Sequence, residues 1–160
     1  MWSHYTSDYK GFVIGFDSEC DFFKPGNGKA VDGLKDVKYS AKRAMAPKNG
    51  LAALSPEEAK AANEAFFFTK SEDWAYEEEV RILANAKKAD LVPTKIDGFD
   101  VCLFKFRKEC VKEIILGPMM DPAKKQEFVD LVAAEYPHVK LFEATLSETE
   151  FDLDINPLAF

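Results

Sequence analysis

The stretch Val111-Lys112-Glu113-Ile114-Ile115-Leu116 predicts a β-strand, because it is rich in β-branched and aliphatic residues and is closed by Gly117-Pro118. Asp121-Pro122 then predicts the start of a helix, since aspartate is a good N-cap and proline suits the first turn. Apolar residues recur at helical spacing after it, at Phe128, Leu131, Val132 and Tyr136, up to Pro137. Residues 139–146 return to a strand pattern, so 111–146 predicts a strand-helix-strand unit with two parallel strands.

Further elements are predicted outward from this unit. Strands are expected at 12–16, 99–106 and 151–155 from the alternation of their side chains, and a short strand is expected at 37–39. A helix is expected over 56–68, because Ser55, Pro56 and Glu58 form a capping box with proline in the first turn. Residues 18–34 are expected to be an exposed loop and 41–54 to be irregular. The fold class is therefore α+β: a mixed, mostly antiparallel sheet with a few packed helices.

Composition limits the class of protein. The chain has 160 residues, of which 47% are hydrophobic, which predicts a single domain spanning 1–160 with a real core. Its formal net charge of −7 argues against sequence-independent binding of nucleic acid, which requires a basic face. No apolar run approaches a membrane span, and the first residues do not form a signal peptide, so we expect a cytoplasmic protein without a membrane partner.

The three cysteines are Cys20, Cys102 and Cys110, and they show no C-x-x-C spacing or nearby histidine. This pattern favours free thiols in a reducing compartment over a disulfide framework, and it indicates no metal site.

Candidate functional residues lie in the stretch Trp74-Ala75-Tyr76-Glu77-Glu78-Glu79-Val80-Arg81-Ile82-Leu83. If residues 74–83 form an interior strand, Glu77, Glu79 and Arg81 share one face while the aromatic and aliphatic residues share the other. Two carboxylates at this spacing lie about 7 Å apart, close enough to hold different parts of one ligand. The structural alternative is that Arg81 pairs with Glu77 or Glu79 and that the cluster has no chemical role.

The chain resembles a bacterial and phage domain family of unknown function. The resemblance rests on M-W-S-H-Y at 1–5, G-F-V-I-G-F at 11–16, T-K-S-E-D-W-A-Y-E-E-E-V-R at 69–81 and K-E-I-I-L-G at 112–117. Such proteins carry an N-terminal half before M-W-S-H-Y, whereas here this stretch begins at Met1. Either the chain is a natural short form, or it lacks strands that would complete the sheet. The second alternative predicts an exposed sheet edge or a homodimer that covers it.

A Glu-x-Glu strand also looks like the signature strand of ADP-ribosyltransferases. That likeness implies Glu79 as the catalytic carboxylate, Glu77 as its helper, and NAD as a substrate. An aromatic ring from Trp2 or Tyr5 would stack on nicotinamide. The cofactor itself is not defined by the sequence.

Other residues have both a functional and a structural interpretation. His4 could serve as a general base near neutral pH, as histidines often do, or it is a hydrogen-bonded packing residue. Lys70 and Trp74, with Tyr76 nearby, would close a pocket around a small molecule, or they are a solvated lysine and core aromatics. Two functions therefore stay open: an ADP-ribosyltransferase-like enzyme, and a non-catalytic module that binds a ligand or a protein.

Overall fold

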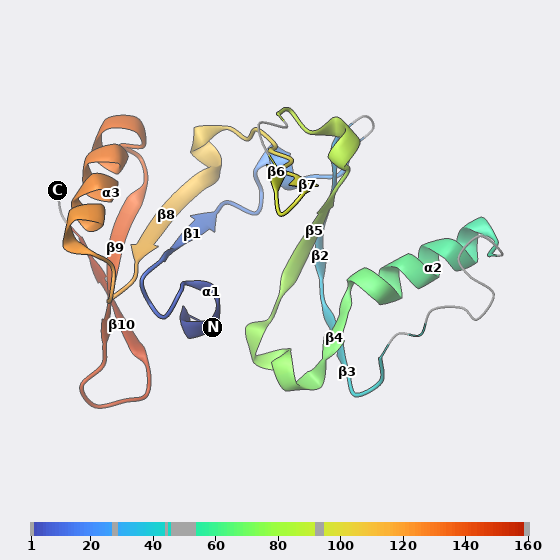
Figure 1. Ribbon diagram of the computed structural model, residues 1–160, viewed down its shortest axis with the longest axis horizontal. Helices are drawn as coiled ribbons and strands as arrows, with labels where there is room; N and C mark the ends of the chain where they lie inside the picture. The colour runs from blue at the N-terminus through green and yellow to red at the C-terminus, as the bar shows by residue number, and fades with distance from the viewer. Residues whose placement is uncertain (1, 27–28, 44, 46–53, 92–94, 159–160) are drawn as a thin grey trace. The chain divides into compact units, whose positions relative to one another are not determined.

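The computed structural model describes residues 2–26, 29–43, 45, 54–91 and 95–158 (Figure 1). The chain forms two compact units. The first unit contains Met1–Phe22 and Asp90–Phe160, and the second contains Phe23–Ala89. The elements are those of an α+β protein with mixed, mostly antiparallel sheets and few helices, which confirms the predicted fold class.

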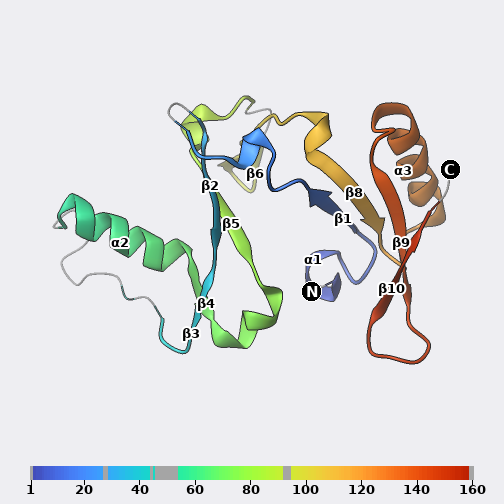
Figure 2. The same cartoon turned by 180° about the vertical axis from the view of Figure 1, so that it is seen from behind.

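The first unit is built on a four-stranded sheet with the order β1-β8-β9-β10 (Figure 2). Its strands are β1 (Phe12–Phe16), β8 (Val111–Leu116), β9 (Lys140–Leu146) and β10 (Leu153–Pro157). β8 and β9 pair in parallel and the other neighbours are antiparallel. The helix α3 (Pro122–Glu135) connects the parallel strands, so the predicted strand-helix-strand unit is confirmed.

One face of α3 packs on this sheet and makes the core. Asp121 caps the helix, since its Oδ1 accepts hydrogen bonds from the backbone N–H groups of Ala123 and Lys124. Val132 of α3 and Leu116 of β8 are both fully buried. The buried residues around them are Val111, Ile114, Met120, Val139 and Leu141. Apart from Met120, these residues lie in the strands and the helix that the sequence predicts.

The rest of the first unit has little regular structure. The helix α1 (Trp2–Tyr5) precedes β1. The 3-10 turn η1 (Asp21–Phe23) follows β1, and the 3-10 turn η5 (Lys108–Cys110) precedes β8. The expected strand over 99–106 is wrong for most of its length. Only β7 (Phe99–Asp100) is strand, paired with β6 (Lys95–Ile96), and Leu103 makes a single bridge to Leu91. Residues 99–106 are largely exposed, so a longer strand there would have no buried face to stabilise it.

Cys20 and Cys110 form a disulfide in the first unit, with their Cα atoms 5.5 Å apart. Cys102 is free. The expectation of three free thiols is therefore wrong for two of them. The two cysteines are 90 residues apart in the sequence, and the pairing of β1 with β8 brings them together. The sequence pattern alone therefore does not indicate this disulfide.

The described part of the second unit contains two short strand pairs. β2 (Val31–Asp36) pairs antiparallel with β5 (Val80–Ala84), and β3 (Lys38–Ser40) pairs in parallel with β4 (Thr69–Ser71). Because β2 begins at Val31, the expectation that 18–34 is all loop is wrong for its last four residues. The chain between β3 and β4 includes the predicted helix, α2 (Pro56–Phe67). Its capping box is present, with the Glu58 N–H donating to Ser55 Oγ and the Ser55 N–H donating to Glu58 Oε2.

The 3-10 turns η3 (Glu72–Glu77) and η4 (Ala86–Lys88) flank β5. The prediction for 41–54 falls mainly on residues outside the described ranges. Within those ranges, every helix is too short or too polar to cross a bilayer.

Candidate functional site

The predicted strand over 74–83 is wrong in its first half. Glu72–Glu77 forms η3, Glu78 has a left-handed backbone with φ 45°, and the strand β5 begins only at Val80. Residues 74–79 contain no β-branched side chain to favour a strand, and short 3-10 turns are common connectors. The strand starts at the first β-branched residue.

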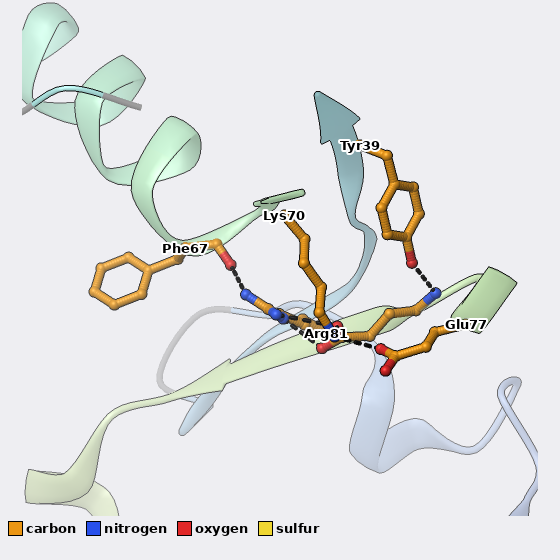
Figure 3. Close-up of polar contacts among 6 residues, drawn as sticks. Tyr39, Phe67, Lys70, Glu77 and Arg81 are labelled. Carbon is orange, nitrogen blue, oxygen red and sulfur yellow. Dashed lines mark hydrogen bonds and ion pairs between the residues drawn. The ribbon is translucent and has the colours of Figure 1, made fainter. Parts of the chain in front are cut away.

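The turn nevertheless brings Glu77 and Glu79 together on one cation (Figure 3). Lys70 of β4 donates from Nζ to Glu77 Oε2, and it also donates to Glu79 Oε2 at 3.1 Å. The side chain of Glu77 is almost completely buried, at 3% exposed. The two carboxylates thus meet through a lysine and a backbone turn, and not through the pleat of a strand.

Arg81 completes the arrangement from β5. Its guanidinium holds both carboxylate oxygens of Glu79, with Nε 2.5 Å from Oε1 and Nη2 3.0 Å from Oε2. Its Nη1 donates to the backbone carbonyl of Phe67, the last residue of α2, at 2.6 Å. From β3, the Tyr39 hydroxyl accepts the Glu79 N–H at 2.7 Å (Figure 3). We call Lys70, Glu77, Glu79 and Arg81 the Glu–Lys–Arg cluster; with its Tyr39 and Phe67 contacts it joins β3, α2, β4, η3 and β5.

The charges of the Glu–Lys–Arg cluster balance, with two cations against two carboxylates. The hydrogen bonds from Arg81, with a further contribution from Lys70, lower the pKa of Glu79 below its ordinary value. The bond to Glu79 raises the pKa of Arg81, and the bond to Glu77 is the main cause of a raised pKa at Lys70. Glu79, Arg81 and Lys70 therefore keep their charges across the neutral range, and Glu79 is a poor proton donor there.

A pocket of about 650 Å³ adjoins the cluster in the second unit. Lys70 belongs to both, and its Nζ lies 4.9 Å from the centroid of the Trp74 ring, in cation–π contact. We call this hollow the basic pocket, because its described lining contains cations and no carboxylate. The lining residues are Ser40, Ala41, Lys42, Arg43, Ala65, Phe66, Thr69, Lys70, Ser71 and Trp74.

The predicted site residues are thus divided between the two units. Glu77, Glu79, Arg81 and Lys70 form the cluster, and Trp74 lies beside it. Tyr76 is 58% exposed, with its ring centroid 6.0 Å from that of Trp74.

The other three predicted residues, Trp2, His4 and Tyr5, lie in α1 of the first unit. His4 and Tyr5 are exposed.

Sequence reasoning missed several residues of this region. Tyr39 and the Phe67 carbonyl reach the cluster from distant parts of the chain, and Lys42 and Arg43 fell in a segment expected to be irregular. Adjacent cations gave no distinguishing signal, because the sequence has further basic pairs at 87–88, 107–108 and 124–125. The described residues contain no group of three histidine, cysteine, aspartate or glutamate side chains placed to hold a metal ion.

The fold and site together define an α+β protein with a charge-balanced cluster beside a basic pocket. Residues 1–82 match a family described as "Protein of unknown function (DUF2971)", and the chain belongs to this family. The match includes the whole Glu–Lys–Arg cluster, whereas the K-E-I-I-L-G stretch at 112–117 lies beyond it. No curated protein and no solved structure matches the chain.

Proposed function

We propose that this chain is a non-catalytic ligand-binding module. The second unit binds a small molecule in the basic pocket, and the Glu–Lys–Arg cluster is structural. The observation that carries the proposal is that Lys70 lines the pocket and is at the same time fixed by both glutamates.

The contacts of the cluster support a structural role. Glu79 accepts two hydrogen bonds from Arg81 and one from Lys70, so both its oxygens are occupied. Neither Glu77 nor Glu79 is among the residues that line the basic pocket. A carboxylate held in this way positions its neighbours, and it must first break an ion pair before it can act on a substrate.

The shape and chemistry of the pocket support ligand binding. Its volume falls within the range of about 300 to 1,000 Å³ that is common for small-molecule sites. Aromatic, hydroxyl and cationic groups meet in it, which is the usual mixture of packing surface and orienting polar groups. A basic pocket in a chain of net charge −7 also concentrates anions locally.

Titration with the fluorescent anion 1-anilinonaphthalene-8-sulfonate tests this proposal. We expect saturable binding of one probe per chain, weakened by Phe66→Ala, which removes a ring of the pocket. The matched control is Phe151→Ala, which removes an exposed ring of the first unit. An absence of saturable binding, or equal effects of the two variants, contradicts the proposal.

An ADP-ribosyltransferase-like enzyme is the second candidate function, with Glu79 as catalytic carboxylate and Glu77 as its helper. One observation favours it: both carboxylates meet at Lys70, and Glu79 is ionised and 26% exposed. The test is release of nicotinamide from NAD by the wild type and by Glu79→Gln. If the wild type releases nicotinamide and the folded Glu79→Gln variant does not, the enzyme proposal replaces the binding-module proposal.

A cytoplasmic location and a homodimer stay predictions.

A further inference from the structure

We infer that the ligand of the basic pocket is a phosphate monoester carried on a planar ring, as in a mononucleotide. This inference rests on the proposed function and specifies the chemical class of its ligand. It depends on two groups of residues in the pocket, one suited to an anion and one suited to a ring.

The anion-binding group consists of Lys42 and Arg43. Within the described ranges, neither side chain has an ion-pair partner, whereas the third cation, Lys70, is neutralised by Glu77 and Glu79. A guanidinium offers several donors in one plane and binds two phosphate oxygens at once. Two adjacent cations match the charge of about −1.5 to −2 that a phosphate monoester carries near pH 7.

Hydroxyl groups of the lining add donors for the phosphate. Ser40 Oγ accepts the Lys42 N–H at 3.0 Å, so its own proton stays available for a ligand oxygen. Thr69 supplies a second hydroxyl. Ser71 is different, because its hydroxyl donates to Asp73 at 2.8 Å.

The ring-binding group consists of Phe66 and Trp74. Phe66 is 60% exposed although it lines a pocket, which leaves apolar ring surface to be covered. Lys70 lies over the Trp74 ring, so Phe66 is the better platform for stacking. Stacking of a base on such a ring is favourable and tolerates any base, because every base has a π-face.

A small ligand fits these observations better than a nucleic acid polymer. The net charge of −7 repels a polyanion, while a single phosphate meets only the local cations of the pocket. The 650 Å³ hollow is also of the size that holds one drug-sized molecule.

Isothermal titration calorimetry with AMP, adenosine and inorganic phosphate tests the inference. AMP combines the phosphate and the ring, so we expect it to bind at least about tenfold more tightly than either of the other two. Arg43→Glu should weaken AMP binding by about tenfold or more while the melting temperature stays unchanged. Lys60→Glu is the matched control, because it makes the same charge change on α2 outside the pocket lining.

Three results would overturn the inference: AMP binding no tighter than phosphate or adenosine, equal effects of Arg43→Glu and Lys60→Glu, or a decadeoxyadenylate that binds more tightly than AMP. The first result together with saturable binding of anilinonaphthalene sulfonate leaves the binding-module proposal intact. A failure of the sulfonate probe removes both.

Discussion

Glu79 is the residue on which the cluster depends. Its carboxylate is shared between Arg81 and Lys70, and its backbone N–H binds the Tyr39 hydroxyl. A single side-chain substitution at Glu79 therefore disturbs contacts with both β4 and β5, while the backbone bond to Tyr39 of β3 stays available. Because the two carboxylates and two cations neutralise one another, removing one charge leaves another partly buried and unpaired, which is the costly outcome for an ion pair.

We predict that Glu79→Gln and Arg81→Ala each lower the free energy of unfolding by about 1 to 3 kcal/mol, the range for charged hydrogen bonds at a partly exposed site. The double variant should lose less than the sum, since both changes remove the same bidentate contact. Urea unfolding of all four proteins measures this coupling. The control is Glu64→Gln, which removes a well-exposed pair with Lys35 at 3.7 Å. Additive losses would mean that Glu79 and Arg81 stabilise the fold independently.

The same carboxylate predicts a dependence of stability on pH. The pKa of Glu79 is lower in the folded chain than in the unfolded chain, where it is about 4.3. Its stabilising contribution is therefore complete above that value and is lost as the pH falls through the lower, folded pKa. We expect the difference in melting temperature between wild type and Glu79→Gln to be constant from pH 7 to about 5 and to shrink below about 4. A difference that persists at pH 2 to 3 would assign the stabilisation to packing.

Elements with a strong period and a clear end could be predicted from sequence. The capping box at Ser55 fixed the start of α2, and the branched apolar run of β8 had a buried face. The stretch 74–79 failed because the left-handed residue Glu78 and a 3-10 turn leave no periodic signature. The local sequence pattern does not predict the backbone conformation where a contact with a distant residue, such as that of Glu79 with Tyr39, helps to determine it.

The candidate site was predictable only in part, for the same reason. The grouping of Glu77, Glu79 and Arg81 follows from their proximity in sequence, and it held even though the backbone between them differs from a strand. Tyr39 and the Phe67 carbonyl lie 40 and 14 residues from their partners, so only the pairing of β3 with β4 and of β2 with β5 brings them in.

The end of β8 carries a prediction about close backbone contact. A Cβ atom on Gly117 would lie 2.2 Å from the Tyr9 carbonyl oxygen and 2.6 Å from that of Gly11. The Gly117 N–H also donates to Gly11 O at 2.9 Å, so neither segment can move freely. We expect Gly117→Ala to destabilise the protein by about 1 to 3 kcal/mol, as overpacking does.

The matched control for this variant is Gly98→Ala. A Cβ there meets nothing within 4 Å, and the cost comes only from the left-handed backbone with φ +84°. That cost is about 1 to 2 kcal/mol. Chemical denaturation of both variants measures the cost of close contact at Gly117 and the cost of backbone conformation at Gly98. Full stability of Gly117→Ala would show that the chain relaxes around the added methyl group.

At the scale of the whole molecule, the chain folds as two compact units, and the first is assembled from both ends of the sequence. Residues 1–22 contribute β1, which pairs with β8 far along the chain. The Cys20–Cys110 disulfide closes this connection covalently, close to the Asp17 N–H that donates to the Cys110 carbonyl at 2.8 Å. An ion pair of Asp17 with Lys112, at 3.3 Å, lies beside it.

We predict that reduction of this disulfide destabilises the first unit, because the bond closes a loop of 90 residues and restricts the unfolded chain. A bond of this kind contributes about 2 to 4 kcal/mol, so the melting temperature should fall when a phosphine reductant is added. Cys20→Ser should melt at the lower temperature with or without reductant, whereas Cys102→Ser should respond as the wild type does.

Alkylation of the unfolded, unreduced protein should label Cys102 alone. After reduction, it should label all three cysteines. Three labels before reduction, with a melting temperature that ignores the reductant, would show that Cys20 and Cys110 are free thiols and that hydrogen bonds and the pairing of β1 with β8 suffice to hold the unit together.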